Sequence, residues 1–186
     1  MNLKSKRDPN ETRIAFTVPG EPVPWKAPRI VRRGAHHAAI SPDEMKAAQA
    51  NIQALAFQAM QDAGLEPLEG PVVLGLRAYR RKGMPSTQVG KDAVTAGILR
   101  PVTTPDASNL AKGTEDALSG VCFIDDAQVV RLVVEKLYST TPRLEIVVQQ
   151  WRPKRDALIA FEARGSKWSR WLRRNFGWPA NERSGR

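Results

Sequence analysis

The chain has 186 residues, of which 29 are Lys or Arg, 19 are Asp or Glu and one is Cys, and its formal net charge is +10 at pH 7. We expect one folded domain with a polyanionic partner. A single cysteine excludes an intrachain disulfide, and no apolar run could span a bilayer or act as a secretion leader, so we expect a cytoplasmic protein.

The first predicted elements are a strand and a β-hairpin. Residues 14–18 alternate between apolar and polar or small side chains, which is typical of a strand. A proline-rich stretch, residues 19–28, ends it. Residues 29–33 and 37–40 then flank Gly34 and are expected to pair. This region is basic, and its cations are Lys26, Arg29, Arg32 and Arg33.

A long helix is predicted next. Ser41, Pro42 and Glu44 have the spacing of a capping box with proline at the first helical position. Apolar side chains then recur every three or four residues and form one stripe: Met45, Ala48, Ile52, Leu55 and Ala59. The helix is expected to continue to about Gly64.

Residues 72–78 alternate like a second strand and lead into a long segment, residues 80–104, that is interrupted by Gly and Pro. Loops of this length are usually functional or disordered. We interpret the segment as a flexible flap that contacts the polyanion through its cations: Arg80, Arg81, Lys82, Lys91 and Arg100.

The remaining elements complete an α+β fold. A second helix is predicted from about Ser108 to Ser119, with Gly120 as its stop. Residues 127–137 and 144–151 are rich in β-formers and are expected to pair as a hairpin. This order of elements predicts a mixed β-sheet with two packed helices.

Acidic residues gather in one segment of this basic chain: Asp106, Glu115, Asp116, Asp125 and Asp126. Carboxylates repel phosphates, so a divalent cation such as Mg²⁺ between acid and phosphate would explain the cluster. The alternative is structural: Asp106 as a cap, Asp116 as a solvated helix position and the Asp125–Asp126 pair as a turn. The pattern alone does not choose between the two.

Geometry limits how these acids can meet. Asn109, Lys112 and Asp116 share one face of the predicted helix, opposite its apolar side chains. That helix would be about 18 Å long, and Asp126 must return almost that far to reach Asp106. A site within one chain therefore requires residues 121–124 to run back along the helix as a strand. Otherwise a second subunit would supply one carboxylate.

Residues 105–129 read PDASNLAKGTEDALSGVCFIDDAQV. This segment resembles the RusA family of Holliday junction resolvases, whose pattern reads roughly P-D-x-D-N-L-x-K, then D-A-L, then D-D-A-Q-V. Weaker likenesses are FTVPGEPVPWKAPR at 16–29, PLEGPVVL at 67–74 and VEKLY at 134–138. The resemblance implies a RusA-like endonuclease domain at residues 12–151, followed by a tail at 152–186.

The resemblance implies a metal-dependent endodeoxyribonuclease and assigns roles to individual residues. Asp106 and Asp126 would be catalytic metal ligands, Lys112 the catalytic lysine and Asp125 a neighbouring ligand. Ser108 stands where the family pattern has a second carboxylate, and a hydroxyl binds Mg²⁺ more weakly. Mg²⁺ is the expected cofactor, and Mn²⁺ would substitute for it. The expected DNA contacts are Lys26, Arg29, Arg32, Arg33, Arg80, Arg81 and Lys82.

The implied activity is resolution of four-way DNA junctions by paired nicks during recombination and repair. The implied assembly is a homodimer, because two equivalent sites suit a substrate with pseudo-two-fold symmetry. Two alternatives stay open: a branched-DNA-binding protein whose metal site is impaired by Ser108, and a nuclease acting on flaps or forks. No membrane partner is expected.

The tail carries most of the excess charge. Residues 152–186 contain ten basic and three acidic side chains. Aromatic and apolar residues recur there at helical spacing, with arginines between them: Trp168, Trp171, Leu172 and Phe176. This pattern is typical of a basic amphipathic helix, which would either contact DNA or pack on the domain.

Overall fold

The computed structural model describes residues 12–33 and 36–153. The predicted helix of the basic tail and the hairpin turn at Gly34 lie outside these residues. Within them, no helix is both long enough and apolar enough to cross a lipid bilayer.

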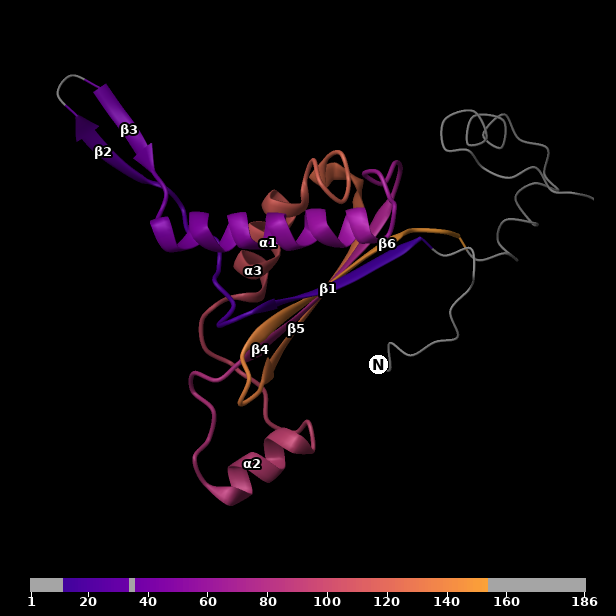
Figure 1. Cartoon of the computed structure of the whole chain (residues 1–186). Coiled ribbons are helices and arrows are strands. Elements are labelled where there is room, and N and C mark those ends of the chain that lie inside the picture. Colours follow the sequence, from indigo (N-terminus) through magenta and orange to yellow (C-terminus); the bar gives the residue numbers. More distant parts are fainter. Residues whose placement is uncertain (1–11, 34–35, 154–186) are drawn as a thin grey trace, which may run out of the picture.

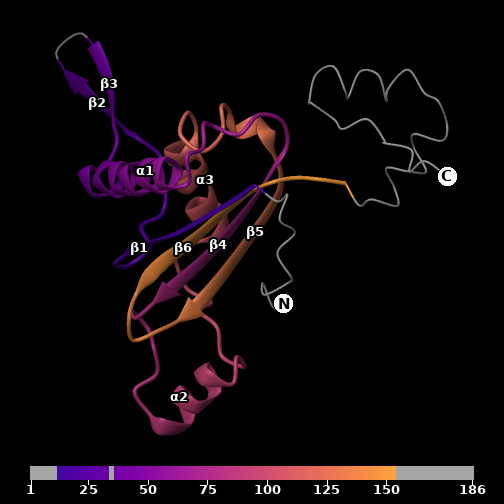
Figure 2. The ribbon, with the colours of Figure 1, turned by 45° about the vertical axis from the view of Figure 1, so that its right-hand side comes forward.

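A four-stranded mixed sheet is the centre of the described part of the chain. Its strands, in spatial order β1-β6-β4-β5, are β1 (Arg13–Pro19), β6 (Arg143–Gln150), β4 (Val72–Arg80) and β5 (Val129–Tyr138) (Figure 2). β6 pairs antiparallel with both β1 and β4, whereas β5 pairs parallel with β4. The sheet and its helices confirm the predicted α+β class.

The predicted hairpin between the last two strands is wrong. A short turn at residues 139–142 joins β5 to β6, but β4 lies between them. The reason is the connection that precedes β5. Parallel strands need a crossover of a dozen or more residues, usually with a helix, and residues 81–128 supply one from β4 to β5. β6 then pairs with the other edge of β4.

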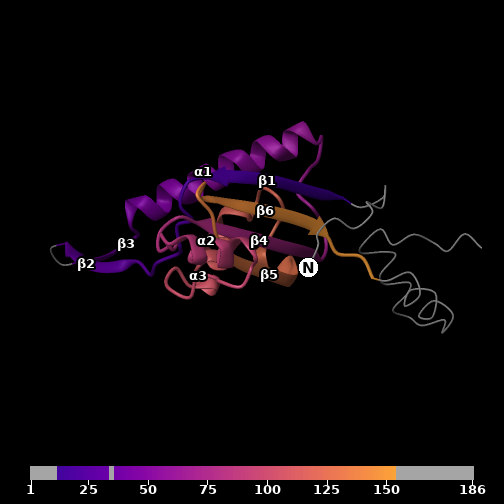
Figure 3. The same ribbon diagram turned by 90° about the horizontal axis from the view of Figure 1, so that it is seen from below.

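Two helices cover one face of the sheet, α1 (Asp43–Asp62) and α3 (Ala107–Leu118) (Figures 1 and 3). Side chains of β4 alternate between buried and half-buried, so one face of this strand enters the core. The helices complete a single hydrophobic cluster, whose most deeply buried large side chains are Leu74, Leu76, Leu110, Leu118, Phe123 and Ile146.

α1 begins one residue later than predicted, and its predicted capping box is wrong. Pro42 occupies the N-cap position, and no side chain caps the helix. The carbonyl of Pro42 accepts hydrogen bonds from the backbone N–H groups of Met45 and Lys46, at 3.1 and 3.2 Å. Because proline itself takes the cap position, Ser41 lies one residue outside the helix, where it lines a hollow beside α1.

The predicted basic hairpin is confirmed, as β2 (Arg29–Arg33) pairs antiparallel with β3 (His36–Ile40). It projects away from the sheet beyond the amino-terminal end of α1 (Figure 1).

The predicted flap contains a short helix, α2 (Gln88–Thr95), that sequence analysis missed. The Thr87 side chain caps it by accepting a hydrogen bond from the Gly90 N–H at 3.3 Å. No residue of α2 is buried, and α2 lies beyond the ends of β4 and β5 (Figure 2). The polar composition and the eight-residue length hid this helix within a Gly- and Pro-punctuated segment.

Candidate active site

The amino-terminal end of α3 presents Asp106 at the surface. Asp106 occupies the N-cap position, but its side chain makes no capping hydrogen bond. Its carboxylate instead accepts a long hydrogen bond, 3.4 Å, from the Asn109 side-chain amide. Ser108 is also exposed. The carboxylate of Asp106 is therefore available for other ligands, although Asp106 does occupy the cap position that the structural alternative expected.

Lys112 lies one turn after Asn109 on the polar face of α3. Its ammonium is 3.8 Å from a carboxylate oxygen of Asp116 and 5.2 Å from the ring centroid of Trp25. The Lys112 side chain is 52% exposed, so the ammonium can still meet a phosphate. The predicted face of Asn109, Lys112 and Asp116 is confirmed, since the opposite side of α3 enters the core.

The Asp125–Gln128 segment is a tightly bonded turn. Asp125 caps the short 3₁₀ helix η1 (Asp126–Gln128) by accepting a hydrogen bond from the Ala127 N–H at 2.8 Å. Gln128 accepts from the Ile124 and Asp125 N–H groups at 2.7 and 2.9 Å. Gln128 also donates to the carbonyls of Leu68 and Gly70 at 3.0 and 2.7 Å, which ties the turn to a second loop.

Through these bonds, Asp125 and Gln128 stabilise the turn. For Asp125 this is the structural role that the alternative interpretation expected. Asp126 differs. It is exposed, and its side chain makes no hydrogen bond to any other residue that the structure describes. The turn thus holds the Asp126 backbone in place and leaves its carboxylate open.

The predicted returning strand at residues 121–124 is wrong. The chain turns tightly after Gly120, whose φ of +77° suits glycine, and Val121 and Cys122 both donate to the Leu118 carbonyl. Phe123 then forms isolated bridges to Leu68 and Ser119. The turn is anchored at the carboxyl-terminal end of α3 because Phe123 is completely buried there.

The charge of Asp126 acts on Glu115, which lies in the last turn of α3. Burial raises the pKa of Glu115, and the charges of Asp126 and Asp116 raise it further, while Lys112 lowers it. Glu115 was counted among the clustered acids, but sequence analysis gave it no role. The effect of Asp126 on Glu115 depends on the turn after α3, which no pattern in the sequence revealed.

Across residues 12–33 and 36–153, no three His, Cys, Asp or Glu side chains lie close enough together to hold a metal ion. The condition for a complete metal site within one chain, a strand at residues 121–124, is therefore not met. Mg²⁺ commonly uses only one or two carboxylates, together with water and phosphate oxygens. Asp106, at the amino-terminal end of α3, and Asp126, after its carboxyl-terminal end, are each exposed and can each offer one such carboxylate, but no strand at residues 121–124 brings the two together.

Replacing Glu115 by glutamine is expected to stabilise the fold at pH 7 in the presence of EDTA. A raised carboxyl pKa means that the folded state disfavours the ionised form, so stability falls as pH rises from the ordinary value of 4.5 through the raised pKa. Urea midpoints at pH 7 and about pH 4 test this. The gain should vanish at the lower pH, and the exposed control Glu66→Gln should show no gain at either.

Six of the seven predicted DNA contacts fall into two groups, and Arg80 belongs to neither. Lys26, Arg81 and Lys82 are exposed, and the carboxylate of Glu21 accepts hydrogen bonds from the backbone N–H groups of Arg81 and Lys82 at 2.9 and 3.0 Å. This contact joins the segment after β1 to the start of the flap. Arg29, Arg32 and Arg33 lie on β2 of the projecting hairpin, where the structure describes their backbone only.

Arg80 is buried, whereas a DNA contact was expected to lie at the surface. It is 5% exposed, and its guanidinium donates to the carbonyl and hydroxyl of Thr103, both at 3.4 Å. Lys136 donates to the same carbonyl at 2.8 Å. Because the side chains on this face of β4 alternate into the core, Arg80 is directed inwards and anchors the returning end of the flap.

The thiol of the single cysteine is shielded from solvent. Cys122 is fully buried, and burial raises the pKa of its thiol to about 11. A neutral buried thiol is a poor nucleophile.

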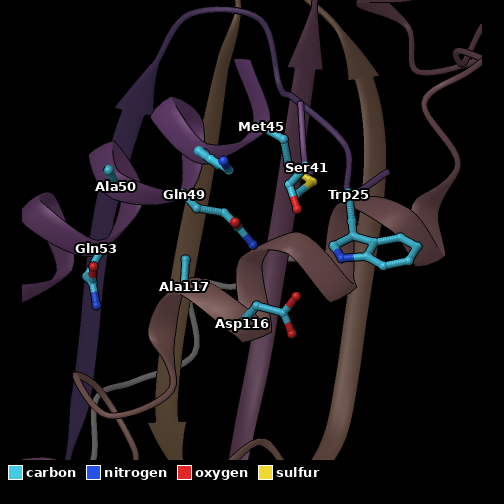
Figure 4. A pocket seen from close by; sticks show the side chains of 9 residues that line it. Trp25, Ser41, Met45, Gln49, Ala50, Gln53, Asp116 and Ala117 are labelled. Atoms are coloured by element: carbon cyan, nitrogen blue, oxygen red, sulfur yellow. The ribbon is translucent and has the colours of Figure 1, made fainter. Parts of the chain in front are cut away.

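A hollow of about 440 Å³ lies between α1 and α3, beside Lys112. Gln49 of α1 and Asp116 of α3 extend into it, and Trp25 lies at one end (Figure 4). Gln49 donates to the Gly113 carbonyl at 3.4 Å, which joins the two helices.

Comparison with known proteins shows the family of the chain. The family model described as "Endodeoxyribonuclease RusA" matches residues 19–149, which run from the end of β1 almost to the end of β6. The chain belongs to the RusA family of endodeoxyribonucleases. It is also 37% identical over 140 residues to "Uncharacterized protein YqaN" of Bacillus subtilis (strain 168), covering 74% of this chain and 96% of that protein. The matched family residues include all of the acidic segment.

Proposed function

We propose that this protein is a Mg²⁺-dependent endodeoxyribonuclease that resolves four-way DNA junctions. One observation supports the proposal above all others. In a basic chain of the RusA family, the polar face of α3 and the following turn present open carboxylates and a half-exposed ammonium at the surface. Such carboxylates repel the phosphates of DNA unless a cation lies between them. A catalytic metal ion would be such a cation.

The residues have separate roles in this proposal. Asp106 and Asp126 would hold the ion, with the Ser108 hydroxyl and a free lone pair of Asp125 as further donors. A second subunit would supply one of the two aspartates, because no strand at residues 121–124 brings them together within one chain. Bound Mg²⁺ would supply Lewis acidity at the phosphate and an acidic water. Lys112 would neutralise negative charge that develops on the phosphate during cleavage. Mn²⁺ is expected to replace Mg²⁺, because both accept oxygen ligands.

We propose that the active form is a homodimer. Two equivalent sites related by a two-fold axis would match the paired, opposed cuts that a four-way junction needs. A partner could also supply a carboxylate, since residues 12–33 and 36–153 of one chain hold no complete ligand group. A DNA substrate and a single buried thiol both suit the cytoplasm.

A second candidate is a protein that binds junctions without cutting them. The exposed serine at position 108 favours it, because the family pattern has a carboxylate there. The deciding experiment is a strand-specific cleavage assay on a mobile four-way junction, with and without Mg²⁺ or Mn²⁺. Paired nicks that need the metal support the nuclease. Tight binding without nicks, together with cutting by Ser108→Asp, would establish the second candidate.

Junction affinity is expected to fall steeply with salt. Each phosphate contact contributes about −0.9 to the slope of log affinity against log salt, so four contacts would cost about a hundred-fold between roughly 50 and 200 mM. Fluorescence anisotropy of labelled junctions in EDTA measures the slope without cleavage. Lys82→Ala should make it shallower by about one contact, because Lys82 is exposed at the start of the flap. A slope near zero would contradict electrostatic binding.

A further inference from the structure

Neither the sequence pattern nor the family comparison assigns a role to Trp25, yet this residue contacts the polar face of α3. Its ring centroid is 5.2 Å from the ammonium of Lys112. Its backbone N–H donates to the carbonyl of Asn109 at 2.9 Å, one turn before Lys112 on the same helix. The backbone of Trp25 is thus joined to α3 by a hydrogen bond that does not depend on Lys112.

Gly113 allows this close approach. A Cβ at position 113 would lie 3.2 Å from the Trp25 nitrogen, which is tighter than an ordinary contact, and 3.5 Å from the Trp25 Cβ. Glycine is unfavourable inside a helix, so its presence in the middle of α3 needs a local reason. The structure supplies one, because the proline-rich segment containing Trp25 lies directly on the helix there.

The ammonium also lies 3.8 Å from a carboxylate oxygen of Asp116. Both side chains of this ion pair are partly exposed, at 52% and 35%, and such a pair restrains a lysine only weakly in water. The aromatic face is a second restraint. A lysine has many rotamers, and contacts of its ammonium with both a ring and a carboxylate reduce the number that it samples.

We propose that Trp25 is a positioning residue that holds the Lys112 ammonium toward the phosphate to be cut. The inference rests on the proposed catalytic function of Lys112 and extends it to a residue 87 positions earlier in the chain. Trp25 itself need not touch DNA. Its contribution passes through the lysine, and this distinguishes positioning from general packing.

Kinetics with two Trp25 variants test the proposal. Trp25→Leu keeps apolar bulk without an aromatic face, whereas Trp25→Phe keeps a smaller face. In single-turnover cleavage at saturating protein, Trp25→Leu should be slower by about two- to five-fold, as expected for loss of an exposed cation–π contact. Junction affinity should not change. Trp25→Phe should recover most of the rate. The matched control is Trp151→Leu, since Trp151 is 40% exposed and follows β6.

A double substitution separates positioning from packing. In a chain that already carries Lys112→Ala, Trp25→Leu should have no further effect on the rate, because the group it positions is gone. Equal slowing in both backgrounds would overturn the proposal, as would equal slowing by Trp25→Leu and Trp25→Phe.

A spectroscopic measurement tests the contact without any activity. The side-chain Hε protons of Lys112, assigned by comparison with Lys112→Arg, should show a ring-current shift that Trp25→Leu removes and Trp151→Leu leaves intact. No shift in the wild type would overturn the proposal. If the wild type shows the shift but never cuts a junction, the proposed function is wrong, and the contact then has no role in catalysis. Normal cutting that needs Lys112 but not Trp25 overturns the present inference alone.

Discussion

Asp106→Asn is expected to lower the rate of junction cleavage on the order of a hundred-fold or more, while junction binding is kept or strengthened. The amide has the same shape as the carboxylate but lacks the charge that would hold a cation. Asp106 is exposed, makes no side-chain cap and accepts only a 3.4 Å hydrogen bond from Asn109, so the helix should be unaffected. Loss of a negative charge beside DNA should also favour binding.

The measurement is single-turnover cleavage of a labelled junction over a range of Mg²⁺ concentrations, with affinity measured in EDTA. Asp43→Asn is the matched control, because Asp43 is another exposed acid at the amino-terminal end of a helix, α1. It should cut at the wild-type rate. An Asp106→Asn chain that cuts as fast as Asp43→Asn would remove Asp106 from the active site.

Phe123→Ala is expected to lower the free energy of unfolding by about 3–5 kcal/mol. Phe123 is fully buried and is the largest of the completely buried side chains in the described part of the chain. Its loss would leave a cavity beneath the turn that joins α3 to Asp126, because Phe123 bridges Leu68 and Ser119 there. Cleavage should therefore weaken even at temperatures where the variant stays folded.

Urea unfolding followed by far-ultraviolet circular dichroism measures the first effect. Phe57→Ala is the control, since Phe57 is 55% exposed on α1 and its truncation should cost roughly 0.5 kcal/mol or less. A loss below about 1 kcal/mol for Phe123→Ala would mean that the turn is not anchored by this ring.

The local elements were predictable because the information that specifies them is local. The helix expected from Ser108 to Ser119 is α3, Ala107–Leu118, and Gly120 takes the positive φ of a helix stop. Alternation predicted β1 and β4 because a strand with one buried face repeats every second residue. The capping box failed because Pro42 occupies the cap position that Ser41 was expected to fill.

Trp25 and Glu115 show what local patterns cannot reveal. Trp25 reaches Lys112 through a contact between distant parts of the chain, and no periodicity links the two. One signal was present, however, because Gly113 lies inside a predicted helix and such a glycine often marks a close approach by another backbone. Glu115 had no comparable signal, since its neighbours depend on how the turn at residues 120–125 folds.

The amino-acid sequence by itself determined the α+β class, the polar face of α3 and the acidic segment, because each follows from residue type and spacing along the chain. Only the tertiary structure decided that β4 separates β5 from β6, that Arg80 is directed into the core and that Asp126 lies near Glu115. These outcomes arise from competition between distant segments for sheet edges and core volume. That competition is resolved only when the whole chain packs, so no window of sequence contains it.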